Sequence, residues 1–183
     1  MDEAHENWNR LVAWLSRVRA RSLPPNMTHA WRVHRYADSV CNGGLGNFLS
    51  TARDRSFTNE ELLQSLDLVG GAKHQETLEK AMEYRKSSSR RARVPKSAQI
   101  AKFMAYDLIL KGASRGEARK FLDAHVQTCS PEQLESAISA ATAEVEIDNG
   151  WHRLDQQFFI VEAELRSCIA SFSDVHVNEW RNG

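Results

Sequence analysis

The chain has 183 residues, 42% of them hydrophobic and 26% charged, which is enough apolar content for the core of one folded domain. No run of about 18 apolar residues is present, so the sequence predicts no membrane span. The acidic N-terminus does not resemble a signal peptide, and the three cysteines are widely spaced. These features favour reduced thiols in a cytoplasmic protein.

The net charge is zero, but the charges are segregated along the chain. Residues 1–84 contain 10 basic and 11 acidic residues. Residues 85–120 contain 11 basic and 2 acidic residues, and residues 121–183 contain 3 basic and 11 acidic residues. Salt screens exposed charges beyond about 8–10 Å, so local fields decide which partners are attracted. The basic middle and the acidic C-terminal part are therefore separate candidate surfaces.

Apolar residues recur at three- and four-residue spacing from the beginning of the chain. Residues 8–18 form an amphipathic pattern that ends at Pro24 and Pro25, because proline cannot continue a helix. A second pattern runs over residues 28–41 and stops at Asn42-Gly43-Gly44. Asn and Gly tolerate positive φ, so these residues predict a tight turn that reverses the chain into a short helix.

The rest of the chain adds helical patterns with start signals at Thr58, Ser114 and Ser130. The expected helices cover residues 58–68, 72–86, 97–111, 114–126, 130–146 and 149–172, with a short terminal turn at 174–180. Residues 87–96 are polar and basic without periodicity, which predicts an exposed loop. No alternating strand pattern competes, so the fold class is all-α. We expect residues 1–183 to form a single domain, an irregular bundle of about eight to ten helices.

Two motifs resemble a widespread bacterial family that includes the DNA-mimic proteins. The first is an Asn-Gly-Gly signature, here Asn42, Gly43 and Gly44, followed by Asn47 and Phe48. The second is a closing Leu-Asp-x-x-Phe helix, here residues 154–165, and residues 176–180 are similar to the family's terminal tail. The family-like region covers residues 28–180.

The resemblance implies an all-α bundle and a homodimer, since the best-understood members are dimers that bind a protein partner by presenting DNA-like negative charge. This neutral chain departs from a strongly acidic DNA mimic, and a basic loop at 87–96 would repel DNA-binding surfaces. Our first hypothesis is a non-enzymatic cytosolic module that binds a protein, with a basic or DNA-binding protein as its partner.

Acidic residues concentrate on the two long C-terminal helices. Spacings of three, four and seven residues place several of them on shared helix faces. The docking face expected there comprises Glu132, Glu135, Glu144, Asp155 and Glu162. A solvated polar face without a partner is the alternative interpretation.

The basic segment 85–120 supports a second hypothesis, binding of nucleic acid or phosphate. Arg90, Arg91, Arg93 and Lys96 cluster in the expected loop, and such cations bind phosphates with release of counterions. The cluster has no interleaved aromatic residues to stack on bases. A solvated loop is again the alternative.

The third hypothesis is an uncharacterised enzyme. His34 and Asp38 lie one helical turn apart and could share a proton, and Cys41 is a candidate nucleophile or a small buried side chain. The sequence supplies no base for Cys41 and no metal spacing among the histidines, so we expect no catalytic residue, metal or cofactor. We also expect the Asn42–Gly44 turn to be structural, with its glycines at positive φ, rather than an anion-binding nest.

Overall fold

The computed structural model describes residues 3–18, 22–51, 56–88 and 93–180, with side chains from Trp8 to Asn178. Across these residues the secondary structure is helical and contains no strand, which confirms the all-α prediction. The chain divides into two compact units, Met1–Glu83 with Arg153–Gly183, and Tyr84–His152. A single domain over residues 1–183 stays a prediction. None of the described helices combines the length and apolarity needed to cross a bilayer.

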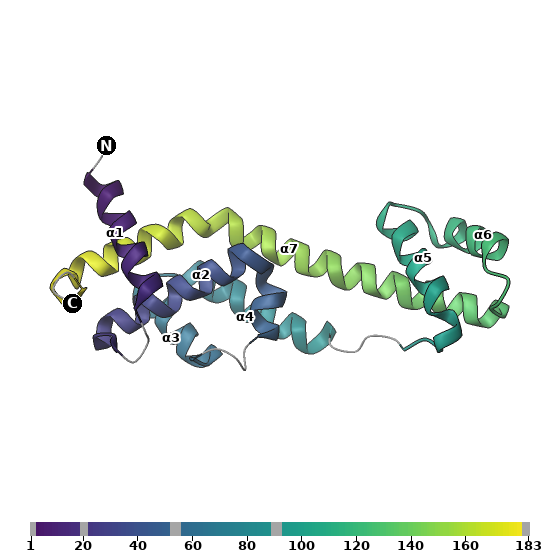
Figure 1. The fold of residues 1–183 in the computed structure, drawn as a ribbon, viewed down its shortest axis with the longest axis horizontal. Helices are drawn as coiled ribbons and strands as arrows, with labels where there is room; N and C mark the ends of the chain where they lie inside the picture. Colours follow the sequence, from purple (N-terminus) through teal and green to yellow (C-terminus); the bar gives the residue numbers. More distant parts are fainter. Residues whose placement is uncertain (1–2, 19–21, 52–55, 89–92, 181–183) are drawn as a thin grey trace. The chain divides into compact units, whose positions relative to one another are not determined.

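The first unit is built around the C-terminal half of the longest helix, α7. Its elements are α1 (Glu3–Arg17), α2 (Pro25–Ser50), α3 (Asn59–Val69), α4 (Ala72–Ser88, as far as Glu83), the second half of α7 (Pro131–Val175) and α8 (Val177–Trp180). Figure 1 shows α2, α3 and α4 gathered along this part of α7. The core is apolar, and Leu15, Tyr36, Leu66 and Phe158 are each fully buried in it.

Local capping decides where α3 begins and ends. The Thr58 side chain accepts a hydrogen bond from the Glu61 N–H (3.1 Å), and the Glu61 carboxylate accepts one from the Thr58 N–H (2.7 Å). Such a capping box satisfies two N–H groups that a helix start leaves unpaired, and the N-cap contributes about 1 kcal/mol. At the other end Gly70 adopts a left-handed conformation with φ of 89°. The start predicted at Thr58 is confirmed.

The second unit packs α5 (Gln99–Leu110) and α6 (Arg115–His125) with the first half of α7, after a short 3-10 helix at Lys96–Ala98. Alanines dominate its core, where Ala101 and Ala105 lie against Leu122 and other apolar residues of this unit. Small side chains allow close approach of helix backbones. The large apolar side chains of Ile100 and Phe103, on the other face of α5, are 71% and 74% exposed.

In two places the structure has one helical element where the sequence predicted two helices. The expected count of about eight to ten helices is therefore slightly off. The break expected near residue 147 is absent, because α7 continues through Gly150. The Tyr84 side chain occupies the place where a Cβ at Gly150 would lie, and its hydroxyl donates to the Ile147 carbonyl at 3.0 Å. This glycine therefore serves close packing inside a helix and does not end one. The other merged pair is α2.

Candidate functional site

The Asn-Gly-Gly segment bends α2 and does not reverse the chain. Gly44 has φ of 75° and ψ of 168°, which interrupts the helix, while the residues on either side remain helical. The predicted positive φ is thus confirmed at Gly44 and wrong at Gly43. One non-helical residue separates two helical stretches, so the break predicted between them is a kink at Gly44 and not a turn of several residues. Asn42 remains in the helix and donates to the Asp38 carbonyl at 2.8 Å.

Asp155 of α7 caps the helix that restarts after the kink. Its Oδ1 accepts a hydrogen bond of 2.7 Å from the Leu45 N–H, although the two residues are 110 positions apart. A Cβ added to Gly44 would lie 2.6 Å from the Asp155 Oδ2. Glycine is therefore required at position 44 for two reasons: it can adopt this backbone conformation, and it leaves room for the Asp155 carboxylate.

Aromatic rings connect the same two motifs in the core. The buried Tyr36 ring lies edge-on to Phe48 (5.1 Å between centroids) and to Phe158 (5.5 Å), and Phe158 contacts His74 at 4.9 Å. Burial raises the pKa of Tyr36 and lowers the pKa of His74, so both stay neutral near pH 7. The predicted structural role of Phe48 agrees with these contacts, and Asn47 lies over Gly43.

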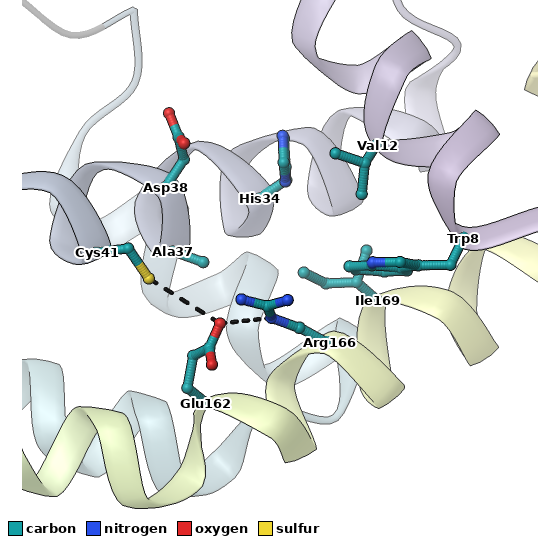
Figure 2. Close-up of a pocket in the computed structure, with 9 residues that line it drawn as sticks. All are labelled: Trp8, Val12, His34, Ala37, Asp38, Cys41, Glu162, Arg166 and Ile169. Carbon is teal, nitrogen blue, oxygen red and sulfur yellow. Dashed lines mark hydrogen bonds and ion pairs between the residues drawn. The ribbon is translucent and has the colours of Figure 1, made fainter. Parts of the chain in front are cut away.

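A hollow of about 200 Å³ opens in the first unit between α1, α2 and α7. Figure 2 shows an apolar side, formed by Trp8, Val12 and Ile169, and a polar side with Asp38, Cys41 and Glu162. The remaining residues around it are His34, Ala37 and Arg166. The hollow combines an apolar wall with charged groups of both signs, as small-molecule sites do.

The chemistry of this hollow does not favour a cysteine nucleophile. Cys41 is exposed, which corrects its expected burial, and its Sγ lies 4.0 Å from the Glu162 Oε1. Partial desolvation and the Glu162 charge raise the pKa of the thiol, so it is protonated at neutral pH. His34 contacts the Ser16 hydroxyl (3.2 Å), and burial lowers its pKa. His34 and Asp38 both line this hollow, but the hydrogen bond of the His34 ring is with Ser16 and not with Asp38.

The five carboxylates predicted to form a docking face on the C-terminal helices are engaged by the chain itself. Three are in ion pairs: Glu135 with Arg115, Glu144 with Lys102 and Glu162 with Arg166. Glu132 accepts from the Ser130 hydroxyl at 2.7 Å, and Asp155 caps Leu45. Cations and hydrogen-bond donors of this chain, from α7 itself or from other elements, thus contact each of the five groups. Partner binding by the five residues stays a prediction.

The basic segment is neutralised in a similar way. Lys102, Lys111, Arg115 and Arg119 each form an ion pair with a carboxylate of the second unit. In the predicted loop 87–96, residues 87 and 88 belong to α4 and Val94 is buried, while Arg93 and Lys96 are exposed. Arg90 and Arg91 lie outside the described residues. The described part of the segment therefore presents fewer free cations than its composition indicates.

Among the described residues, α3 and α4 also carry exposed carboxylates that have no ion-pair partner. Between residues 59 and 83, both lysines are in ion pairs, Lys73 with Glu164 (2.7 Å) and Lys80 with Glu76 (2.7 Å). Four exposed carboxylates have no ion-pair partner among the described residues: Glu60, Asp67, Glu79 and Glu83. Residues 59–83 contain six acidic and two basic residues. This acidic excess does not appear in the net charge summed over residues 1–84.

No group of three or more His, Cys, Asp or Glu side chains that could hold a metal ion occurs in the described part of the chain. The described side chains form an apolar core with charged groups at its surface. They define an all-α protein with a carboxylate-capped kink in α2 and free carboxylates on α3 and α4.

A family model described as DMP19-like protein matches residues 21–123. This is more than half of the 183 residues, and the chain belongs to the DMP19-like protein family. The resemblance seen at Asn42–Gly44 is thereby confirmed. The closing helix motif at residues 154–165 lies outside the matched region, although the structure joins it to the kink through Asp155. No curated protein and no solved structure matches the chain.

Proposed function

We propose that this chain is a non-enzymatic cytoplasmic protein that binds a DNA-binding protein through the free carboxylates of α3 and α4. The family is that of a DNA-mimic protein, which suggests partners that otherwise bind DNA. A protein of this kind offers carboxylates where DNA offers phosphates, and the partner supplies the lysines and arginines that recognise both.

The observation that carries the proposal is that α3 and α4 together bear four exposed carboxylates with no ion-pair partner in the described structure: Glu60, Asp67, Glu79 and Glu83. All four lie in the region that matches the family model. Seven residues separate the first two and four separate the last two, so each pair shares one side of its helix. A net charge of zero does not weaken this attraction, because a partner senses charges within a Debye length of about 8 Å.

Binding without catalysis agrees with the state of the side chains in the hollow. The raised pKa of Cys41 keeps the thiol protonated, and the lowered pKa of His34 leaves a neutral ring that contacts Ser16. The three cysteines are free, as expected in a reducing compartment. A homodimer, implied by the family resemblance, stays a prediction that light scattering of the purified chain would test.

The test is affinity capture of partners on the immobilised chain, followed by elution with duplex DNA. We expect a DNA-binding protein to be retained at low salt and released by the duplex, because the DNA and the carboxylates compete for one basic surface. Failure of the duplex to release any bound protein would contradict DNA mimicry. Direct binding of the duplex to the chain itself would favour the alternative function, through Arg93 and Lys96.

A matched pair of variants then locates the surface. The test variant carries Glu60→Gln, Asp67→Asn, Glu79→Gln and Glu83→Gln. The control removes the same number of exposed carboxylates elsewhere: Glu132→Gln, Glu135→Gln, Glu146→Gln and Asp174→Asn. We expect the test variant to lose the captured protein and the control to retain it. The opposite result would move the site to the acidic residues predicted on the C-terminal helix.

A further inference from the structure

Helix α5 of the second unit (Figure 1) has two apolar faces, one buried and one exposed. Ala101 and Ala105 lie fully buried in the core of this unit. On the opposite side of the helix, Ile100, Phe103 and Leu110 are 71%, 74% and 51% exposed. A helix that is apolar all round is normally covered all round. We propose that the exposed face of α5 binds the same face of a second copy of this chain, with the two helices antiparallel.

The exposed face has the spacing of a helix–helix contact. Its central residues, which we call the α5 stripe, follow at intervals of three, four and three positions: Ile100, Phe103, Asp107 and Leu110. Successive a and d positions of a heptad have these intervals, and side chains at them form one narrow seam that fits another helix. A helix that lies on a membrane has free cations on the face opposite its apolar side. In α5 that opposite face is buried, so a second helix fits the stripe better than a lipid surface does.

The charge of the α5 stripe suits a neutral partner surface. Asp107 is the charged residue of the stripe, and its Oδ2 accepts a hydrogen bond from the Lys111 Nζ at 2.7 Å. This ion pair leaves the stripe without net charge, so neither a strongly acidic nor a strongly basic surface is attracted to it. A second copy presents the same apolar residues and the same neutral pair. An identical stripe therefore matches this one in charge as well as in shape.

The α5 stripe is also complementary to itself when one copy is reversed. A two-fold axis beside position 105, the midpoint of the stripe, places Ile100 of each copy against Leu110 of the other. The same symmetry places the Phe103 ring of each copy over the Asp107–Lys111 pair of the other. An aromatic ring attracts an ammonium group over its face, and the apolar stem of the lysine adds contact area. Each position of the stripe thus meets a suitable position of the second copy.

The size of the stripe predicts a weak dimer. A buried phenylalanine covers about 150–250 Å², so the exposed apolar side chains of two stripes remove on the order of 800 Å² from water. Stable complexes bury about 1,200–2,000 Å², and transient ones bury less. We therefore expect a Kd of about 10–100 µM, so that the dilute chain is a monomer and the concentrated chain is a dimer.

This surface is separate from the partner site proposed above. The α5 stripe belongs to the second unit, and the free carboxylates from Glu60 to Glu83 belong to the first. Failure of one proposal is therefore distinguishable from failure of the other, because the dimer is measured on the purified chain without any partner.

The experiment is sedimentation velocity of the full chain from about 5 to about 500 µM, a range that spans the expected Kd. We expect the mass to rise from that of one chain to that of two. Ile100→Ser combined with Phe103→Ser should raise the Kd at least about tenfold. The matched control is Phe159→Ser combined with Ile160→Ser, which removes side chains that are 51% and 81% exposed on α7 in the first unit. The control should dimerise like the unchanged chain.

The outcomes that overturn the proposal are equally definite. An unchanged chain that stays monomeric over the whole range refutes the dimer. A control that loses the dimer, or an α5 variant that retains it, removes the interface from α5. Far-UV circular dichroism verifies that both variants are folded, as expected for substitutions at exposed positions.

Disulfide cross-linking then tests the antiparallel register. Ile100→Cys and Leu110→Cys are prepared separately and mixed before mild oxidation, because in the antiparallel pairing only a mixed dimer brings the two new thiols together. We expect more disulfide-linked dimer in the mixture than in either variant alone. The native cysteines contribute equally to all three samples. Equal cross-linking in the three samples, or more in a single variant, refutes the antiparallel pairing.

Discussion

Replacement of Gly44 by alanine tests the central contact of the first unit. Gly44 combines φ of 75° with ψ of 168°, a region that glycine alone populates readily. Its Cβ position lies 2.6 Å from the Asp155 Oδ2, so a methyl group there would displace the carboxylate. The Leu45 N–H, fully buried in α2, would then lose its acceptor.

The expected loss of stability has two parts. Holding a residue with a Cβ in this conformation costs about 1–3 kcal/mol. Loss of a hydrogen bond to a charged acceptor costs about 1.5–3 kcal/mol. Gly44→Ala should therefore lower the free energy of unfolding by about 2.5–6 kcal/mol, and Gly44→Val by at least as much.

Urea unfolding followed by circular dichroism measures this loss as a shift of the midpoint at constant slope, by about 2 M for a chain of this size. Gly116→Ala is the control, because its Cβ meets no atom within 4 Å in α6, and it should be neutral or stabilising by about 0.5–1 kcal/mol. In an Asp155→Ala background, Gly44→Ala should cost only the conformational part. A loss below about 0.5 kcal/mol from Gly44→Ala alone would refute the reasoning.

Three other expectations concern protonation and packing. Burial lowers the pKa of His74 in the folded protein below its ordinary value of 6.5, so below pH 6.5 the unfolded chain binds more protons than the folded one. The free energy of unfolding should therefore decrease as the pH falls from 6.5 to the folded pKa. His74→Gln should flatten the pH–stability curve over this range. The raised pKa of Cys41 should make its iodoacetamide labelling at pH 7 slower than that of free cysteine, and an equal rate would contradict the protonated thiol. Ile100→Ser and Phe103→Ser should each change the unfolding free energy by less than about 0.5 kcal/mol, whereas Leu122→Ala should lower it by about 2–5 kcal/mol in the same urea assay.

Helix starts could be predicted because they depend on residues within one turn. Helices begin at the predicted signals Thr58, Ser114 and Ser130, and each of these residues forms reciprocal hydrogen bonds with a Glu or Gln three positions later. The positive φ of Gly44 was also predictable, since the need for glycine is a property of the backbone. These features require no knowledge of which helices are neighbours.

The sequence by itself therefore determined the all-α class, the family resemblance and the principal caps. Only the tertiary structure decided that Asp155 caps Leu45, that Arg166 and Asp38 line one hollow, and which carboxylates remain free. Composition counts charges, but an exposed charge acts on a partner only if no neighbour in the fold neutralises it. Whether a charge is neutralised depends on contacts between residues as far apart in the sequence as Lys73 and Glu164. Neither a local sequence pattern nor the net charge of a segment reveals such contacts.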